Sequence, residues 1–433
     1  MRFDQVAQFI EAPNPPDSAR AFAATLLIDT LAVCAGAKDL EVGRIVRNHA
    51  VAHLGGDAAT VLFDGRRASI PGACFASASQ TDNLDAHDGL NPTKGHIGCA
   101  VVPALMAFAE GRGVRGTDGL DLMVMAYEVA ARAAMALHGT VSDYHTSGAW
   151  NGLGVAALGW RILGGDRDQL RQGLGIAEYH GPRSQMMREI ANPTMLHDGS
   201  GMGAMTGAMA ALLAAEGFTG APAITLEDDA AAPFWADLGT DWTIERNYIK
   251  PYPICRWAHA ALDGLASLNL READVAAIHV RTFAQAAALY PAMPETTSQA
   301  QYSLPFALAT LLRFGRIGPE HVMQGALQDP DTDAVLQRIT VEEDPEISAR
   351  FPRDRVSEVT VTLTSGETLT SGIVHARGGP EAPMTDAEIE AKVRAMAAAG
   401  IGEARAAELW SMRDRLLNEE AHMDDLIAMC RQP

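Results

Sequence analysis

The sequence predicts a mainly α protein with an α+β lid: a large all-helical domain built from both chain ends and a smaller inserted α+β domain. Three observations lead to this fold class. Apolar residues recur at helical spacing through about the first 220 residues. Alternating β-branched residues follow after about residue 270, and a capped helical pattern returns at Thr385. We therefore expect the helical domain over 1–268 and 385–433, with the lid over 269–384.

The first predicted helix covers residues 17–37. It begins with Asp17 or Ser18, both suitable helix caps, and continues with apolar residues at helical spacing. Only a hairpin-like stretch near 59–70 interrupts the helical patterns of the first half. The abundant Ala and Gly residues let helix backbones approach closely. The other predicted helices of this half are 96–111, 120–137, 152–163, 168–180 and 201–217.

Three stretches of the lid carry strand patterns. Residues 276–283 are β-branched and alternating. Residues 356–363 and 368–374 flank a turn at Ser365–Gly366, which is typical of a hairpin. Proline and charged residues predict loops over 344–355 and 377–383.

The charge balance limits the classes of partner. Across 433 residues, 34 Lys and Arg face 54 Asp and Glu, for a net charge of −20. Such a surface repels nucleic acid and anionic membranes, so we expect neither as a partner. An anionic substrate therefore needs local positive charge at its site.

The cysteines and the N-terminus indicate the cytoplasm. The cysteines are odd in number, widely spaced and mostly in apolar runs, as expected for reduced core thiols. The N-terminus lacks the pattern of a secretory signal, and the apolar runs are too short or interrupted to span a bilayer. No C-x-x-C motif supports a zinc ribbon or an iron–sulfur site. The five cysteines are Cys34, Cys74, Cys99, Cys255 and Cys430.

Polar residues gather in the stretch 82–96, directly before a very apolar helix. Free backbone N–H groups and the helix dipole favour an anion at such a helix start. The alternatives are a solvated loop with a helix cap, and a metal site, although the spacing is not that of a helical H-x-x-x-H pair. The cluster consists of Asp82, Asp85, His87, Asp88, Lys94 and His96.

Two further histidines precede apolar helices. His145 is followed by Thr146 and Ser147 and is a candidate acid or base, or else a structural histidine. His197 and Asp198 precede glycines and a helix, where a capped helix start is the alternative. The glycines after His145 lack the preceding strand and the downstream acid of a dinucleotide-binding fingerprint.

The segment 250–259, KPYPICRWAH, concentrates positive charge in an acidic protein. Two prolines stiffen it, and Lys250, Arg256 and His259 project from it. Such a cluster suits a di- or tricarboxylate. The alternative is a buried turn that enters a helix.

Taken together, these stretches resemble the MmgE/PrpD family, which includes 2-methylcitrate dehydratase, cis-aconitate decarboxylase and iminodisuccinate epimerase. The resemblance implies an active site between the helical domain and the lid, a homodimer, and chemistry without metal or organic cofactor. The matching stretches run in the family's order and cover most of the chain. They are LLIDTLAVCAGA at 26–37, LDAHDGLNPTKGHIGCAVVPALMAFAE at 84–110, YHTSGAWNGLGVAALGWRILGG at 144–165, HDGSGMGAMTGAMAALLAAEGFTGAP at 197–222, KPYPICRWAHAALD at 250–263, QYSLPFALATLL at 301–312, and the hairpin with TDAEIEAKV within 356–393.

The resemblance also implies roles for individual residues. Asp85 and His96 match the first aspartate and the closing histidine of the family's loop, and His145 matches the histidine of H-x-T. Lys250 and Cys255 match the lysine and cysteine of K-x-Y-P-x-C. The sequence departs from the family at Ile97, which stands in place of the common proline, at Ser147, in place of the threonine, and at Thr194 and His197, where many members have a lysine in the stretch.

The shared chemistry of such enzymes is proton movement at a carbon beside a carboxylate. It needs a base with a pKa near neutral and cations for the enolate-like charge. We expect His96 and His145 to be the acid and base, with either one as the base, and Asp85 to orient a histidine. Lys250 would hold a substrate carboxylate. Arg256, His197, His259 and Lys94 complete the predicted substrate-binding set.

The leading hypothesis is a cofactor-independent lyase that acts on a small di- or tricarboxylate by dehydration. An isomerase or a decarboxylase on the same scaffold is the first alternative. A non-catalytic carboxylate binder is a second, although binding alone needs cations more than two histidines. A metal-dependent hydrolase centred on Asp85, His87 and Asp88 is a third.

Overall fold

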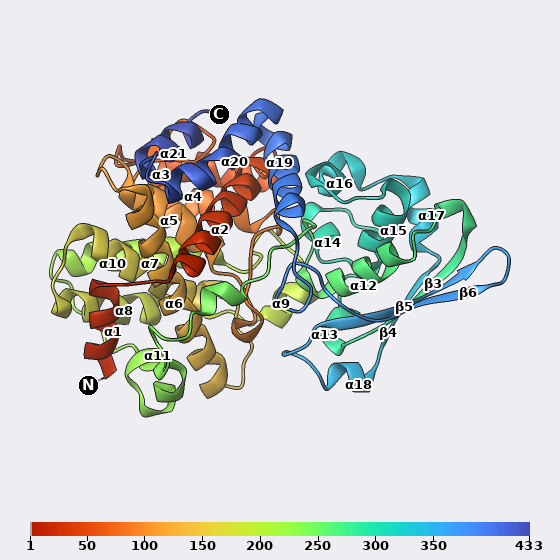
Figure 1. Cartoon of the computed structure of the whole chain (residues 1–433), viewed down its shortest axis with the longest axis horizontal. Coiled ribbons are helices and arrows are strands. Elements are labelled where there is room, and N and C mark those ends of the chain that lie inside the picture. The colour runs from red at the N-terminus through yellow and green to blue at the C-terminus, as the bar shows by residue number, and fades with distance from the viewer. Residues whose placement is uncertain (1) are drawn as a thin grey trace.

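The computed structural model describes residues 2–433 and has two lobes (Figure 1). We call residues 2–249 with 386–433 the helical lobe and residues 250–385 the sheet lobe. Both chain termini lie in the helical lobe. The architecture is mainly helical with a small mixed sheet, which confirms the predicted fold class.

The first part of the helical lobe contains all six helices that the sequence predicts. The predicted hairpin-like stretch forms β1 (Ala59–Thr60) and β2 (Arg67–Ala68). The helices are α1 (Arg2–Glu11), α2 (Asp17–Gly36), α3 (Glu41–His53), α4 (Ile70–Asp82), α5 (Gly98–Ala109), α6 (Gly116–Thr140), α7 (Asn151–Leu163), α8 (Arg167–His180), α9 (Met186–Ala191), α10 (Ser200–Ala215) and the short α11 (Ile224–Glu227).

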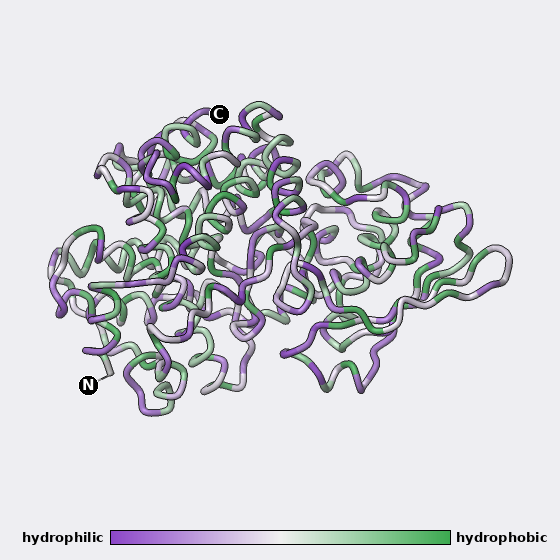
Figure 2. Tube along the Cα trace, viewed as in Figure 1, coloured by the Kyte–Doolittle hydropathy of each residue, from purple (hydrophilic) through white to green (hydrophobic). Residues whose placement is uncertain are grey.

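Small residues let the helices of this lobe pack closely, as the composition predicts. A Cβ atom added at Gly207 of α10 would lie 2.3 Å from the carbonyl oxygen of Gly152 in α7. Only glycine allows that backbone contact. The hydrophobic stretches gather in the interior of the lobe (Figure 2).

The C-terminal helices return to the first ones. They are α19 (Asp386–Ile401), α20 (Glu403–Leu417) and α21 (Met423–Cys430). Helix α19 packs against α2, and a Cβ atom at Gly400 would lie 1.9 Å from the carbonyl oxygen of Ala35. Lys392 of α19 forms a buried ion pair with Asp29 of α2 and donates to the carbonyl of Ala86 at 2.8 Å. The helical lobe is therefore completed by the last part of the chain.

The sheet lobe has four strands in the order β4-β3-β5-β6. β3 (Val275–Thr282), β5 (Val356–Leu363) and β6 (Thr368–His375) are the predicted strands, and they pair antiparallel. β4 (Ile339–Glu343) pairs parallel to β3 at the edge and was not predicted. Five residues that end in two glutamates carry too short an alternation to indicate a strand.

Helices cover the inner face of the sheet. α12 (Arg256–Ser267) packs on β5, β6 and α15, so it lies with the sheet, although the predicted boundary at 268 assigns it to the helical domain. The remaining helices are α13 (Ala284–Ala287), α14 (Thr297–Gln301), α15 (Leu304–Phe314), α16 (Pro319–Val322), α17 (Pro330–Leu336) and α18 (Pro345–Ser348).

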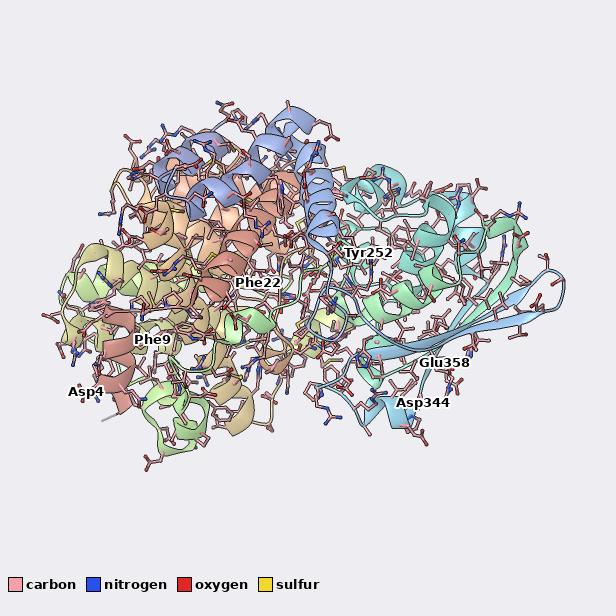
Figure 3. The ribbon with its side chains drawn as sticks, in the orientation of Figure 1. Asp4, Phe9, Phe22, Tyr252, Asp344 and Glu358 are labelled. Carbon is pink, nitrogen blue, oxygen red and sulfur yellow. The ribbon has the colours of Figure 1, made fainter. Side chains whose placement is uncertain are left out.

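Ion pairs lie on the outer side of the sheet. Asp344 and Glu358, both labelled in Figure 3, pair with Arg281 of β3. Asp344 also accepts hydrogen bonds from the backbone N–H groups of Glu346 and Ile347, which caps α18. This network fixes the start of α18, the short helix before the loop that leads to β5.

One helix, α2, is long and apolar enough to cross a membrane by length and composition alone. In the structure 83% of its most apolar window is buried inside the protein. That burial fits a core helix.

Candidate active site

A small cavity brings four of the predicted site residues together: Asp85, Lys94, His96 and Arg256. Its lining comes from both lobes. The cavity volume is about 20 Å³, which is room for little more than one water molecule. The surrounding side chains therefore leave almost no room for a substrate in this structure.

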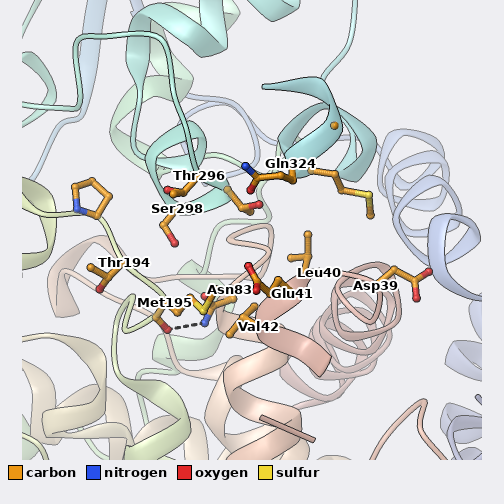
Figure 4. Close-up of a pocket in the computed structure, with 14 residues that line it drawn as sticks. Asp39, Leu40, Glu41, Val42, Asn83, Thr194, Met195, Thr296, Ser298 and Gln324 are labelled. Carbon is orange, nitrogen blue, oxygen red and sulfur yellow. Dashed lines mark hydrogen bonds between the residues drawn. The ribbon is translucent and has the colours of Figure 1, made fainter. Parts of the chain in front are cut away.

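A larger cavity of 540 Å³ lies elsewhere between the lobes (Figure 4). Thr296 and Ser298 of the sheet lobe face Thr194, Met195 and Glu41 of the helical lobe across it, and none of its lining residues is a cation. An acidic and hydroxyl-rich wall offers a carboxylate no charge partner. We therefore place the candidate active site in the smaller cavity.

The tautomer of His96 follows from its contacts. Its Nδ1 atom lies 2.7 Å from the carbonyl oxygen of Asp88, and a carbonyl only accepts, so Nδ1 carries the hydrogen. Nε2 of the neutral ring then has a free lone pair. Burial and the charge of Lys250 hold the pKa of His96 well below its usual range. At neutral pH the side chain is an unprotonated base.

Close packing fixes the position of the His96 ring. A Cβ atom at Gly89 would lie 2.8 Å from Nδ1 of His96 and 2.3 Å from the hydroxyl of Tyr248. The backbone N–H of His96 donates to the hydroxyl of Ser147 at 2.9 Å. The loop before α5 thus holds the base through its backbone and through the neighbouring segment.

Asp198 faces His96 and was not among the predicted site residues. Its Oδ2 atom lies 3.3 Å from Nε2 of His96. Burial, with the nearby charges of Asp82 and Asp85, raises the pKa of Asp198 to about 8. At neutral pH most Asp198 side chains are therefore protonated, and each offers a proton donor beside the base.

Lys250 and Asp85 form a fully buried ion pair. The ammonium also donates to the backbone carbonyl of Asp85 at 2.9 Å. Burial lowers the pKa of Lys250, but Asp85, Tyr248 and Cys255 together raise it overall. Lys250 is not in the cavity wall and already has an anionic partner. Asp85 contacts Lys250, where the sequence hypothesis paired it with a histidine.

Three cations line the cavity without a carboxylate partner: Lys94, Arg256 and Arg355. Among residues 2–433, no Asp or Glu lies within ion-pair distance of any of them. Arg256 donates only to the carbonyls of residues 376 and 377, and its guanidinium lies 4.2 Å from the Tyr248 ring centroid. With Asp85 paired and Asp198 protonated, the cavity has a net positive charge.

Three residues of this region have left-handed backbone conformations, with φ of 53° at Asp85, 58° at Lys94 and 47° at His197. Such conformations are unfavourable for residues with a Cβ atom. Their occurrence together at one place is typical of a functional site that the surrounding structure holds in position.

His145 does not line the cavity. Its backbone N–H donates to Nε2 of His138 at 3.2 Å, and the two rings stack with centroids 6.5 Å apart. It follows Tyr144, which does line the cavity and whose ring lies beneath the ammonium of Lys94 at 5.4 Å. Burial and the charge of Arg183 lower the pKa of His145.

His197 and His259 also lie outside the cavity wall. The ring of His197 is buried 5.2 Å from the ring of Tyr302, a lining residue, and burial and the charge of His87 lower its pKa to about 3. Nε2 of His259 donates to the carbonyl of Ile254 at 2.9 Å, and the side chain is fully buried. In this structure His259 connects α12 to the turn before it.

A buried cluster beneath the cavity could hold a metal ion. Asp82, His87 and Cys99 bring one ligand atom each within 4.8 Å of one another. The predicted metal set is Asp85, His87 and Asp88. Of these, only His87 belongs to the trio, and Asp85 pairs with Lys250. Burial raises the pKa of Asp82 to about 7 and lowers that of His87 to about 4, so the cluster is close to neutral.

Several lining residues had no signal in the sequence. Arg355 comes from a loop that the composition marks only by proline and charge. Tyr302 lies just before the apolar run of α15, and single aromatic residues of that kind are usually part of a core. The sequence places Asp198 beside His197 before a helix, but it indicates no role for Asp198 beyond a helix cap. The other residues of this group are Tyr144, Met186, Tyr248 and Trp257.

Family comparisons cover nearly the whole chain. The MmgE/PrpD N-terminal domain matches residues 3–237 and the MmgE/PrpD C-terminal domain matches residues 252–417. No curated protein matches the chain in sequence. The gap between the two matches contains Tyr248, a lining residue, and Lys250, beneath the cavity.

Proposed function

Because the chain belongs to the MmgE/PrpD family, whose members are typically hydro-lyases, we propose that it is a cofactor-independent lyase acting on a small di- or tricarboxylate. The observation that carries the proposal is that a neutral His96 and three cations without carboxylate partners line one small cavity. A base without charge and a positively charged wall suit abstraction of a proton beside a carboxylate.

His96 takes the proton from the carbon next to the substrate carboxylate through Nε2. Its low pKa rises when an anion enters, because the substrate offsets the repulsion from Lys250 and Arg355 that disfavours imidazolium. The cations stabilise the enolate-like charge that develops on the carboxylate. Binding of an anionic substrate thus makes His96 a stronger base.

Asp198 gives its proton to the leaving hydroxyl, which departs as water. Asp198 takes the place of His145, which the sequence paired with His96 without deciding which was the acid, since Asp198 lines the cavity and His145 does not. After elimination His96 is protonated and Asp198 is ionised. The 3.3 Å separation lets the proton return from Nε2 to the carboxylate and restores the starting state.

Lys250 has a different role in this proposal from the one predicted. Paired with Asp85, it holds the loop carboxylate and adds positive potential beneath the cavity, while Lys94, Arg256 and Arg355 meet the substrate. The five buried, free cysteines support a cytoplasmic location. We retain the homodimer as part of the proposal.

Deuterium incorporation tests the proposal. The enzyme is incubated in D₂O with citrate-like, aconitate-like and amino-dicarboxylate compounds, and mass spectrometry follows deuterium at carbon. We expect exchange with at least one compound and a loss of about 10²–10⁴-fold in His96→Asn. His49→Asn, an exposed histidine on α3, is the matched control.

The possible results separate the alternatives. If the wild type exchanges no compound, the lyase proposal is overturned. If His96→Asn exchanges normally, the base is another residue. Loss of exchange after chelation would favour the metal-dependent alternative at Asp82, His87 and Cys99. Exchange with inverted stereochemistry and no loss of water would identify an epimerase.

A further inference from the structure

The sheet lobe contributes two cations to the cavity: Arg256 at the start of α12, and Arg355 from a loop. Arg355 lies between α18 and β5, and its side chain reaches the cavity that contains His96 and Asp198. Only 5% of Arg355 is exposed. Its Nε and Nη2 atoms are buried and have no hydrogen-bond partner in the described part of the chain.

Two buried guanidinium nitrogens without partners are costly. Buried donors in proteins are nearly always satisfied, and a buried charge normally has a counterion. Lys94 and Arg256 line the same cavity, and Asp354, which lines a second small cavity with Arg355, pairs with Arg350 and Arg353 instead. The missing partner is therefore an anion that comes from outside the chain.

The loop holds Arg355 in place by packing. Its guanidinium lies 5.8 Å from the ring of Phe351, which stacks on Phe283 at 5.1 Å and meets Trp257 edge-on at 6.2 Å. Asp344 caps the preceding helix α18 and pairs with Arg281, which ties that helix to β3. An arginine fixed before the ligand arrives loses little entropy on binding.

We propose that Arg355 binds a substrate carboxylate remote from the carbon that loses its proton, so that one ligand contacts both lobes. The inference rests on the proposed function and narrows its substrate class. The planar guanidinium meets a carboxylate through two parallel hydrogen bonds, for which Nε and Nη2 are the free donors. Selection of a polycarboxylate over a monocarboxylate therefore depends on the sheet lobe.

Calorimetric titration with unreactive probes tests this role. Tricarballylate has three carboxylates and no hydroxyl to eliminate, while acetate has only one carboxylate. We expect Arg355→Met to weaken tricarballylate binding by about 10–100-fold and to leave acetate binding unchanged. Arg355→Lys, which keeps the charge but loses the paired donors, should recover part of the affinity.

Arg353→Met is the matched control. Arg353 lies two residues away in the same loop, is 85% exposed and pairs with Asp354, so this variant changes the net charge equally. It should bind tricarballylate like the wild type. Circular dichroism and thermal unfolding of both variants check that the lobe remains folded.

Each outcome decides the inference. Equal affinity for tricarballylate in Arg355→Met and the wild type would overturn it, and so would an equal loss for acetate and tricarballylate, which is the mark of a general structural defect. Absence of tricarballylate binding to the wild type would also overturn it. Deuterium exchange in the wild type is measured separately, so the lyase proposal stands or falls on its own result.

Discussion

Asp29 of α2 and Lys392 of α19 form a buried ion pair across 363 positions of sequence. Neither side chain is more than 4% exposed. Because the pair lies where the two ends of the chain meet, it connects the last helices to the first long one.

Lys392→Met should destabilise the helical lobe strongly. Removal of one partner leaves Asp29 buried without a counterion, at a cost of about 3–5 kcal/mol in the free energy of unfolding. Urea denaturation measures this change. Arg394→Met on the same helix, 43% exposed, should cost less than about 1 kcal/mol. Similar values for the two variants would contradict the structural role of the pair.

Lys250→Met should lower stability as well as activity. A free substrate anchor would leave folding intact, but Lys250 is fully buried against Asp85, so its removal should cost about 3–5 kcal/mol. Asp85→Asn in the same chain removes the stranded charge and should restore much of the stability without restoring turnover. Urea denaturation and deuterium exchange of both variants give the two readouts. A fully stable single variant would contradict this expectation.

The pKa of Asp198 predicts how activity and stability depend on pH. Since its proton is needed for elimination, kcat/KM should fall as pH rises through about 8. The folded pKa is raised above the unfolded value near 3.8, so the folded state holds the proton longer. The contribution to stability is complete at low pH and is lost as pH rises towards 8, by at most about 1.4 kcal/mol per pH unit.

Asp198→Asn checks this assignment. Asparagine cannot ionise, so the variant should lose activity and its unfolding free energy should vary less with pH between about 4 and 8. Thermal unfolding across this pH range provides the measurement. An unchanged slope would show that Asp198 is not protonated in the native protein.

Exposed methionines on α10 predict where two copies would meet. Met202 and Met209 lie on one face of this helix and are 43% and 44% exposed. A row of exposed apolar side chains on a rigid helix suits a symmetric interface. We expect a dimer by light scattering at micromolar concentration, and a shift towards monomer in Met209→Glu. Ile373→Glu, at a similarly exposed position on the sheet lobe, is the control.

The predicted residues that line the cavity lie in loops directly before a helix or at its first residue. Asp85, Lys94 and His96 belong to the one loop before α5, and all three line the cavity. Arg256 reaches the cavity from the start of α12. His259 stands one helical turn further on, and its ring turns instead to the carbonyl of Ile254. Residue spacing gives the face of a helix but not the hydrogen-bond partner of a side chain.

Tertiary pairing explains what sequence reasoning missed. The partner of Lys250 is 165 positions away, and no local pattern indicates that Asp85 will neutralise it. The protonated state of Asp198 depends on burial among other carboxylates, which appears only when α4, the Asp85 loop and α10 meet. Arg355 becomes a site residue only because Phe351 packs its loop against Trp257.

The small volume of the cavity sets the timing of turnover. In the proposed reaction, a space for about one water molecule admits a tricarboxylate only if the cavity widens, and product release then requires the same change. The residence time of a bound ligand would then be set by how often the cavity widens. Such motions occur on the microsecond to millisecond scale. In the narrow cavity the proposed enolate-like intermediate would meet few water molecules, so unwanted protonation by solvent would be slow.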